Sequence, residues 1–195
     1  MAKEFDFYFD IGSPATYLAW TQVPRLAEET GAKANYKPIL LGGVFKATGN
    51  SSPITVPEKG RWLFKDLTRW ANRYGIEFNL NSKFPINTLY MMRGMIAYLE
   101  DDRFLALGDA FFEAMWVKDK DLNQPEVMAE VVSSAGVDPA EFMERINDQK
   151  TKDALMEATQ AVIDRAAFGA PTFFVGDEMF WGQDRMEFVR DALLN

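Results

Sequence analysis

Hydrophobic and polar residues alternate at the beginning of the chain, and this period of two is typical of a β-strand. Phe5, Phe7 and Phe9 occupy one face of a segment that ends at Asp10. Aromatic residues favour strands because they pack well on a half-buried pleated surface. We therefore predict a first strand over residues 5–10, with its phenylalanines facing the core.

The apolar spacing changes to that of a helix directly after this strand. Ser13 is predicted to be the helix N-cap, and Pro14 suits the first helical position because no N–H is needed there. Gly31 is a typical C-terminal stop, and Pro24 predicts a kink before it. Residues 33–39 predict a second strand, so the chain opens with a βαβ unit.

The middle of the chain carries mostly helical periodicity. Residues 42–58 are instead rich in Gly, Pro, Asn and Ser, which predicts a loop with about one helical turn in it. Asn87 and Asp138 are expected to cap two of the helices that follow. Apolar spacing and helix-end signals predict helices over residues 59–74, 87–99, 103–117, 125–135, from 139 onwards, and 150–167.

The C-terminal part returns to strand character. Residues 172–175 and 179–181 predict two strands joined by a hairpin turn. Residues 184–194 predict an amphipathic helix, and Asp184 is a natural N-cap for it. The predicted order is therefore βαβ, a run of helices, and ββα.

This order of elements indicates an α/β chain with an insertion. We expect residues 1–43 and 168–195 to form one unit, because they hold all the predicted strands. Residues 44–167 are expected to form an all-helical domain inserted into that unit.

Two residue types are missing from the sequence, and their absence restricts the chemistry. The chain contains no Cys and no His. It therefore has no disulfide, no Cys nucleophile and no Ser-His-Asp triad, and it lacks the usual ligands for zinc or an iron–sulfur cluster. We expect no metal site. Any chemistry must come from hydroxyls, carboxylates, amines, backbone dipoles or a bound cofactor.

The charge of the chain disfavours some classes of partner. The formal net charge is −8 and no basic stripe is present, so we expect no binding to nucleic acid. No stretch approaches the ~18 apolar residues of a membrane span, and no apolar signal segment opens the chain. We therefore expect a cytoplasmic protein that does not contact a membrane.

Three segments spread along the chain resemble one known family. They are Phe9-Asp10-Ile11-Gly12-Ser13-Pro14-Ala15-Thr16-Tyr17-Leu18, the pair Thr48-Gly49-Asn50 and Pro57-Glu58-Lys59-Gly60, and Phe168 to Val175 followed by Phe180-Trp181-Gly182-Gln183-Asp184-Arg185. Together they are similar to the 2-hydroxychromene-2-carboxylate isomerases and the kappa-class glutathione transferases. The resemblance implies a thioredoxin-like fold of the DsbA type, in which the βαβ and ββα parts form one sheet.

The resemblance also implies a glutathione site. Ser13 would be the catalytic residue, because it stands where thioredoxin-like oxidoreductases keep a reactive thiol and would hydrogen-bond the glutathione sulfur. This chain departs from the common family pattern at Gln183, often Ser or Asn, and at Ala170, commonly Val or Leu. The residues that would bind glutathione are Asn50, Lys59, Ala170 through its backbone, a cis Pro171, Gln183 and Asp184.

Simple energetics agree with a thiol-activating role for Ser13. A thiol has a pKa near ~8.5, and lowering it by about two units requires roughly 2.7 kcal/mol. A helix N-terminus contributes about 0.3–1 kcal/mol, and a hydrogen bond to a charged sulfur adds roughly 1.5–3 kcal/mol. The alternative is that these residues have only structural roles. Ser13 would then be only a helix cap, Asn50 a turn residue and Lys59 a solvated charge.

The first functional hypothesis is a glutathione-dependent isomerase acting on 2-hydroxychromene-2-carboxylate or a similar aromatic or unsaturated small molecule. The resemblance implies that the thiolate adds, the ring opens, a bond rotates and glutathione leaves. The alternatives are a kappa-like transferase that conjugates an electrophile, and a thioredoxin-fold module that binds glutathione without catalysis. The resemblance also implies a homodimer.

Met91, Met92 and Met95 could line an adaptable pocket, although helix packing is their ordinary use.

Overall fold

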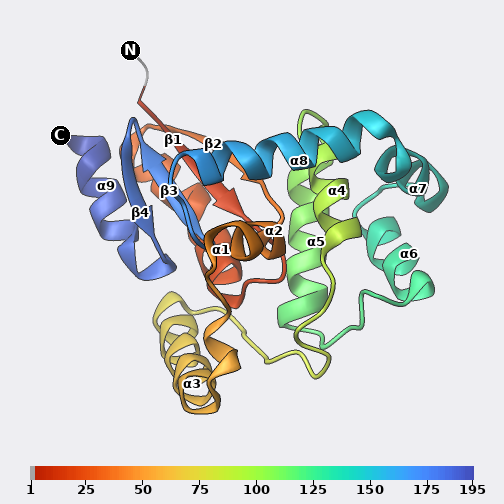
Figure 1. Ribbon diagram of the computed structural model, residues 1–195, viewed down its shortest axis with the longest axis horizontal. Coiled ribbons are helices and arrows are strands. Elements are labelled where there is room, and N and C mark those ends of the chain that lie inside the picture. Colours follow the sequence, from red (N-terminus) through yellow and green to blue (C-terminus); the bar gives the residue numbers. More distant parts are fainter. Residues whose placement is uncertain (1–2) are drawn as a thin grey trace.

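The computed structural model describes residues 3–195, which form a four-stranded sheet surrounded by helices (Figure 1). The chain opens with a strand, a long helix and a second strand, as the sequence predicted. It closes with a hairpin and a helix, which lie beside the opening strands in the sheet. The bounds of these elements are β1 (Glu4–Phe9), α1 (Pro14–Thr30), β2 (Lys33–Pro38), β3 (Thr172–Val175), β4 (Glu178–Trp181) and α9 (Met186–Leu194).

The sheet joins the two ends of the chain in the order β2-β1-β3-β4. Strands β1 and β2 are parallel, whereas β3 is antiparallel to both β1 and β4. Phe7 is the central residue of this register, since it pairs with Tyr36 on β2 and with Phe173 on β3. Long-range pairing of the first and last strands is the thioredoxin topology that the predicted order of elements implied.

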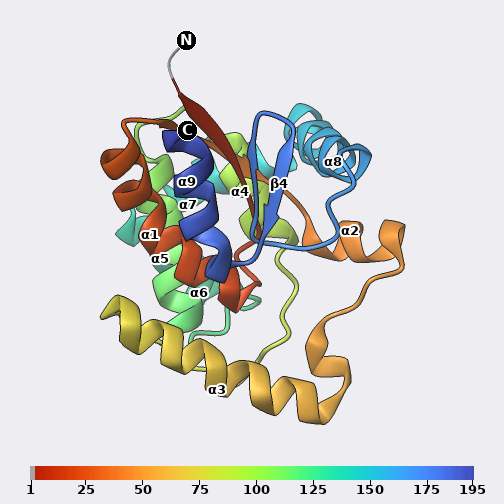
Figure 2. The same cartoon turned by 90° about the vertical axis from the view of Figure 1, so that its left-hand side faces the viewer.

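Both faces of the sheet are covered by helices (Figure 2). Phe5, Phe7 and Phe9 are fully buried on the face under α1, and the Phe7 ring stacks on Phe173 with centroids 5.1 Å apart. Tyr8 and Phe174 point to the opposite face, where they pack with residues of the helical segment that precedes β3. Burial on both faces explains why the last three residues of β1, Phe7–Phe9, are all aromatic rather than alternately apolar and polar.

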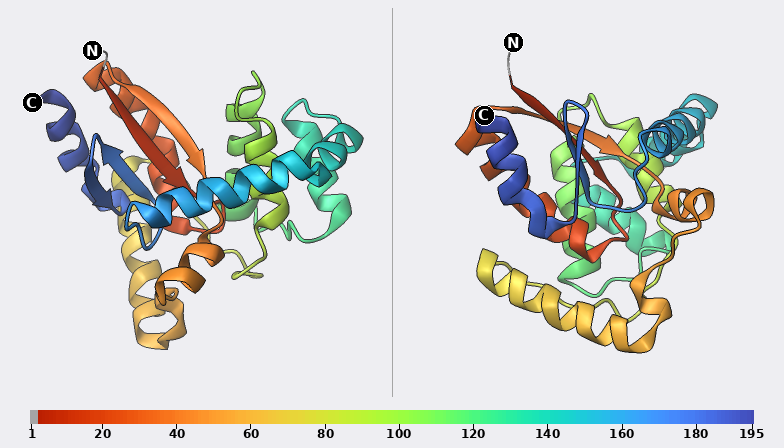
Figure 3. Two further views of the ribbon diagram at one scale, coloured as in Figure 1. Left: turned by 45° about the horizontal axis from the view of Figure 1, so that its top comes forward. Right: turned by 60° about the vertical axis from the view of Figure 1, so that its left-hand side comes forward.

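Only helices occur between β2 and β3 among the described residues. One of them, α8, extends from α6 and α7 back to the sheet (Figure 3). Buried residues of α4, α5 and α6 belong to the same core cluster as the phenylalanines of β1. The division at residues 44 and 167 therefore stays a prediction. The helices are α2 (Leu41–Thr48), η1 (Pro53–Thr55), α3 (Pro57–Tyr74), α4 (Leu89–Ala97), α5 (Phe104–Trp116), α6 (Pro125–Ser134), α7 (Pro139–Asn147) and α8 (Gln149–Asp164).

The predicted loop over residues 42–58 contains more helix than the one turn expected, because Leu41–Thr48 form α2, a helix of 8 residues. The second and third residues of α2 are Gly42 and Gly43, and each glycine disfavours a helix by roughly 1 kcal/mol. Packing outweighs that cost. Val44 is fully buried against α8, and the Thr159 hydroxyl on α8 accepts a hydrogen bond from Leu40 N–H at 3.0 Å.

Helix caps account for smaller differences. Asp138 caps α7 as predicted, since its carboxylate accepts the Glu141 N–H. Helix α4 begins later than predicted, and Thr88 rather than Asn87 is the residue at its N-cap. Asn87 still accepts a hydrogen bond from Leu89 N–H at 3.0 Å.

The methionines of α4 do not line a pocket. Met91, Met92 and Met95 are all fully buried in the main core. Their ordinary use as packing residues is therefore the correct one, and that hypothesis about an adaptable pocket was wrong. Within residues 3–195, no helix combines the length and the apolar character that a membrane crossing requires.

Candidate functional site

Ser13 lies between the end of β1 and the first turn of α1, and it is the N-cap that the sequence predicted. Its backbone is extended, Pro14 follows at the first helical position, and its Oγ accepts the Thr16 N–H at 3.2 Å. The same hydroxyl donates to the carbonyl of Ala170 at 3.0 Å, although that residue is 157 positions away. Ser13 therefore serves as a cap and also faces the segment that precedes β3.

That segment contains the proline expected opposite Ser13. The Ala170–Pro171 peptide bond is cis, as predicted. The Pro171 carbonyl accepts the Gly182 N–H at 3.0 Å, which joins this turn to the end of β4. The N–H of Ala170 makes no hydrogen bond within residues 3–195, and neither does the N–H of Ala15 in the first turn of α1. Both donors can therefore serve a ligand.

Glycine is the only residue type that fits well at position 182. Its φ of +106° with ψ of 148° lies in a region that side chains rarely adopt, and a Cβ there would come within 2.5 Å of Asp184 Oδ1. The adjacent Gln183 is 8% exposed. Its side-chain amide makes no hydrogen bond within the described chain, whereas its main-chain carbonyl accepts one from Tyr74. The glycine thus turns the chain so that Gln183 and Asp184 follow directly after the Pro171 contact.

Asp184 does not cap the last helix, so that part of the sequence prediction was wrong. Helix α9 begins at Met186, and no side chain accepts a cap hydrogen bond there. Residues Gln183–Arg185 form a short 3-10 turn instead, because the chain must first leave the Gly182 conformation. The Asp184 carboxylate pairs with Arg185 at 2.7 Å.

Asn50 lies near the same turn, whereas Lys59 stands further out. The Asn50 amide donates to the carbonyl of Phe168 at 2.8 Å, two residues before Ala170. Lys59 lies in the first turn of α3, is exposed, and makes no ion pair within residues 3–195. Its neighbour Arg61 is neutralised by Glu58 at 2.7 Å. Lys59 is therefore an unpaired cation in the first turn of α3, as far as residues 3–195 show.

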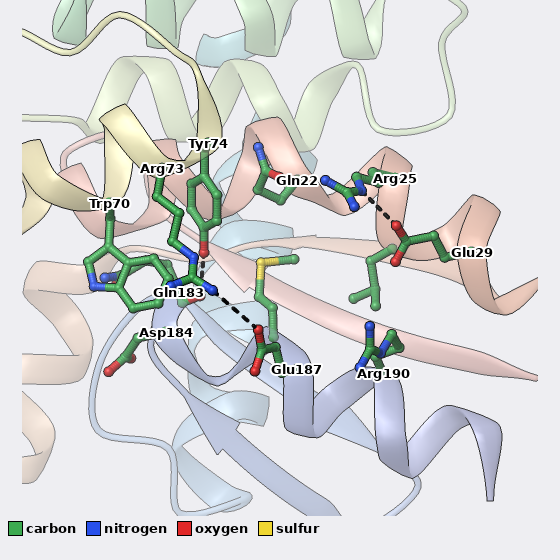
Figure 4. Close-up of a pocket in the computed structure, with 12 residues that line it drawn as sticks. Gln22, Arg25, Glu29, Trp70, Arg73, Tyr74, Gln183, Asp184, Glu187 and Arg190 are labelled. Atoms are coloured by element: carbon green, nitrogen blue, oxygen red, sulfur yellow. Dashed lines mark hydrogen bonds and ion pairs between the residues drawn. The ribbon is translucent and has the colours of Figure 1, made fainter.

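Gln183 and Asp184 also border a cleft between α1, α3 and α9 (Figure 4). Its volume is about 230 Å³, and Ser13, Asn50 and Lys59 are not among the residues that line it. The Tyr74 hydroxyl donates to the Gln183 carbonyl at 3.2 Å across this cleft. Burial, reinforced by the Asp184 charge, raises the pKa of Tyr74 to about 12, so the hydroxyl keeps its proton near neutral pH.

Hydrogen bonds thus connect several of the predicted site residues to one another or to their neighbours in the chain. Ser13 contacts Ala170, Pro171 contacts Gly182 beside Gln183, and Asn50 contacts Phe168. The side chains of Lys59, Gln183 and Asp184 make no such contact with the group within residues 3–195, since Asp184 pairs only with Arg185. The α1 N-terminus, the cis-proline turn and the end of β4 together form one polar cradle around a serine hydroxyl.

Sequence reasoning missed Asp10, which is 1% exposed and lies directly before the Ser13 turn. It ends an aromatic strand, and a carboxylate at the end of a buried strand is a signal that could have drawn attention to it. Burial raises the pKa of Asp10, and hydrogen bonds from Leu41, Gly12 and Thr88 oppose that shift.

Ile11 is held by two side chains of the helical region. Its N–H points to Met92 Sδ at 3.3 Å, and its carbonyl accepts the Trp116 indole N–H at 2.8 Å. These contacts span 81 and 105 positions of sequence, so no local pattern could reveal them. The helices between β2 and β3 therefore clamp the turn that carries Ser13.

This fold and this cradle define a class of protein. The DSBA-like thioredoxin domain family matches residues 4–194, and the chain belongs to it. A probable DsbA oxidoreductase from Streptomyces coelicolor has the same fold, with a TM-score of 0.78 at 18% identity over 98% of this chain and 88% of its own. This chain shares that fold, but it contains no Cys and so has no thiol for disulfide exchange.

More similar relatives carry the names that the sequence motifs suggested. A 2-hydroxychromene-2-carboxylate isomerase of Sphingobium xenophagum is 32% identical over 100% of both chains. Glutathione S-transferase kappa 1 of Caenorhabditis elegans is 30% identical over 96% of this chain and 89% of its own. A solved structure of a 2-hydroxychromene-2-carboxylate isomerase has a TM-score of 0.88 at 32% identity, covering 97% of this chain and 94% of that chain. The expected resemblance is confirmed, and the chain belongs to the same family as these isomerases and transferases.

Proposed function

We propose that the chain is a glutathione-dependent isomerase that acts on 2-hydroxychromene-2-carboxylate or a similar aromatic or unsaturated compound. The observation that carries the proposal is the Ser13 hydroxyl, 3.0 Å from the carbonyl of Ala170 and at the N-terminus of α1. A hydroxyl at that point can donate to a sulfur but cannot be oxidised, so it suits a cofactor thiol rather than disulfide exchange.

The residues present fit glutathione. The free N–H of Ala170, beside the cis bond to Pro171, can bind the extended main chain of the cysteinyl part. The side-chain amide of Gln183 makes no hydrogen bond within residues 3–195, so it is free to bind a ligand. Lys59 and Asn50 can hold the glycyl end, and Asp184 the amino group of the γ-glutamyl end.

Bound glutathione would supply the thiolate that adds reversibly to the unsaturated substrate. The task of Ser13 is then to turn its hydroxyl from the Ala170 carbonyl toward the sulfur and donate to it. The Ala15 N–H and the α1 dipole add positive potential at the same point. Ser13 keeps its proton, because the sequence has no imidazole to remove it. These donors suffice to lower a thiol pKa by about two units.

A kappa-like transferase is the second candidate, because a transferase relative aligns over 96% of this chain. The same cradle would activate the thiol, and the sulfur would stay on the product. A module that binds glutathione without catalysis is a third possibility. We further propose a homodimer in the cytoplasm, in keeping with the resemblance.

Calorimetry with millimolar glutathione tests the cofactor, since a specific ligand also raises the melting temperature by mass action. The absence of both binding heat and thermal shift would sink the proposed function. An absorbance assay of the interconversion of 2-hydroxychromene-2-carboxylate, run beside a free-thiol assay, then separates the candidates. An isomerase interconverts the substrate at constant thiol concentration, and a transferase consumes the thiol. A binding module neither interconverts the substrate nor consumes the thiol.

A further inference from the structure

One buried carboxylate fixes the turn that carries Ser13. Asp10 Oδ1 accepts the Gly12 N–H at 2.8 Å, and the Asp10 main-chain carbonyl accepts the Ser13 N–H at 3.1 Å. The side chain and the main chain of one residue therefore close the same turn. No ion pair joins Asp10 to a cation within residues 3–195, so neutral donors alone hold it.

The second carboxylate oxygen reaches two other elements. Asp10 Oδ2 accepts the N–H of Leu41, the first residue of α2, at 2.8 Å. It also accepts the hydroxyl of Thr88, the residue before α4, at 3.2 Å. One side chain thus joins the Ser13 turn to the start of α2 and to the start of α4.

Packing leaves this turn little room to shift. A Cβ on Gly12 would lie 2.7 Å from Thr88 Cγ2 and 3.3 Å from Asp10 Oδ1. The Thr88 methyl therefore supports the turn from the side of α4. Beyond Leu41, α2 leads to Asn50, whose amide contacts Phe168 near the cis-proline turn.

We propose that Asp10 is a positioning residue: it fixes the Ser13 hydroxyl relative to α2, and so sets the distance between the thiol donor and the segment that carries Asn50. Asp10 does not touch the reacting atoms and acts only through the turn. This inference rests on the proposed function and assigns a residue that the sequence motifs did not single out.

The variant Asp10→Asn separates positioning from bare electrostatics, because the two effects have opposite signs. Asn retains the size but replaces one acceptor oxygen by an NH₂ group, which would oppose the Leu41 N–H. Removal of a negative charge alone would lower the pKa of a nearby thiol. Loss of the Ser13 donor geometry would raise it. A rise therefore identifies positioning.

We expect Asp10→Asn to raise the pKa of the bound glutathione thiol by about one unit, and to lower kcat about threefold near pH 7. The dissociation constant of glutathione should change by less than about threefold, since its ends are held elsewhere. The measurement is a thiolate absorbance titration of the complex, with calorimetry for affinity. An unchanged or lowered thiol pKa with intact binding would overturn the proposal.

Milder variants guard against loss of folding. Thr88→Val removes one donor to Asp10 while keeping the shape, so it should move the thiol pKa in the same direction by a smaller amount. Thr88→Ser restores the hydroxyl and should reverse most of that change. Thr159→Val is the matched control: it frees the Leu40 N–H at the start of α2 without touching the Ser13 turn, and the thiol pKa should not move.

Hydrogen exchange measured without glutathione tests the positioning role of Asp10 independently of the proposed glutathione-dependent function. Thr16 N–H is bonded to Ser13 Oγ, so its hydrogen exchange reports the hydroxyl position directly. Faster exchange at Thr16 in Asp10→Asn than in Thr159→Val supports positioning even if wild type fails to bind glutathione. Equal exchange in the two variants counts against Asp10, whatever happens to the proposed function.

Discussion

At the scale of single residues, the serine hydroxyl has two partners and one proton. Ser13 accepts from Thr16 N–H as a cap and donates to the Ala170 carbonyl. The sequence revealed the cap and, through the motif, the cis Pro171 opposite it. It could not reveal Asp10 as the anchor of the turn, because the partners Leu41 and Thr88 come from distant segments.

Ser13→Ala should affect chemistry more than binding. Loss of one donor to the sulfur should raise the pKa of the bound thiol by roughly one to two units, with a rate about threefold to twenty-fivefold lower near pH 7. Part of the rate should return as the pH rises, because the thiolate then forms without help. A thiolate titration and a pH–rate profile check this.

Loss of a helix cap alone must be separated from loss of the thiol donor. Asp138→Ala removes the cap of α7, and each cap contributes about 0.5–2 kcal/mol to the free energy of unfolding. Asp138→Ala should therefore lower stability like Ser13→Ala but leave the thiol pKa alone. Equal thiol pKa values in both variants would reduce Ser13 to a cap.

Lys59→Ala should weaken glutathione binding with little effect on kcat. Its ammonium has no ion-pair partner within residues 3–195, so it can compensate the anionic glycyl end. An exposed charge pair contributes up to about 1 kcal/mol, so the dissociation constant should rise about two- to fivefold, less at high salt. Arg61→Ala is the matched control, because Glu58 already neutralises Arg61. Equal effects of the two variants in calorimetry would remove Lys59 from the site.

At the scale of elements, periodicity located every strand and most helices, whereas α2 was missed. Strand β1 is short and has phenylalanine at every second position, and α5 has a clear apolar stripe, so local sequence determined both. Helix α2 depends on Val44 packing against α8, and packing with a distant helix leaves no local pattern. The N-cap of α4 is Thr88 rather than the predicted Asn87 for a similar reason. The Thr88 hydroxyl contacts Asp10, which lies far away in the sequence.

The two glycines of α2 should respond differently to alanine. A Cβ at Gly42 meets nothing within 4 Å, so Gly42→Ala should stabilise the protein by about 0.4–1 kcal/mol through the unfolded state. A Cβ at Gly43 would lie 3.2 Å from Thr159 Cγ2, so Gly43→Ala should gain less or lose stability. Urea unfolding of the two variants measures the difference, and a larger gain at Gly43 would contradict the packing of α2 on α8.

At the scale of the whole molecule, ion pairs between helices shape the response to acid. Arg103 binds Asp101 at 2.8 Å and Glu141 on α7 at 3.0 Å. These contacts hold the pKa of both carboxyls below their usual values. A lowered carboxyl pKa stabilises the fold above the ordinary pKa of the group, and this contribution disappears as the pH falls through the lowered value.

Arg103→Met should therefore be less stable than wild type at neutral pH, and the gap should close as the pH falls below about 4. Melting temperatures at several pH values measure this. Arg25→Met, which breaks an exposed pair with Glu29, should show little loss at any pH. A gap that stays constant down to about pH 2 would mean that Arg103 acts through packing on the Tyr98 ring instead.

Ser13 stands where thioredoxin-like oxidoreductases keep a reactive thiol, and this difference affects how such an enzyme withstands oxidants. With Ser13 in place of a thiol and no Cys anywhere, peroxide finds no side chain on which to form a sulfenic acid. Met92, beside the turn, is fully buried, while Met143 and Met156 are 43% and 64% exposed on α7 and α8. On the proposed function, the reactive sulfur arrives with each glutathione and departs with it. Oxidative damage at the centre of catalysis would therefore be discarded with the ligand, and no repair of the protein would be needed.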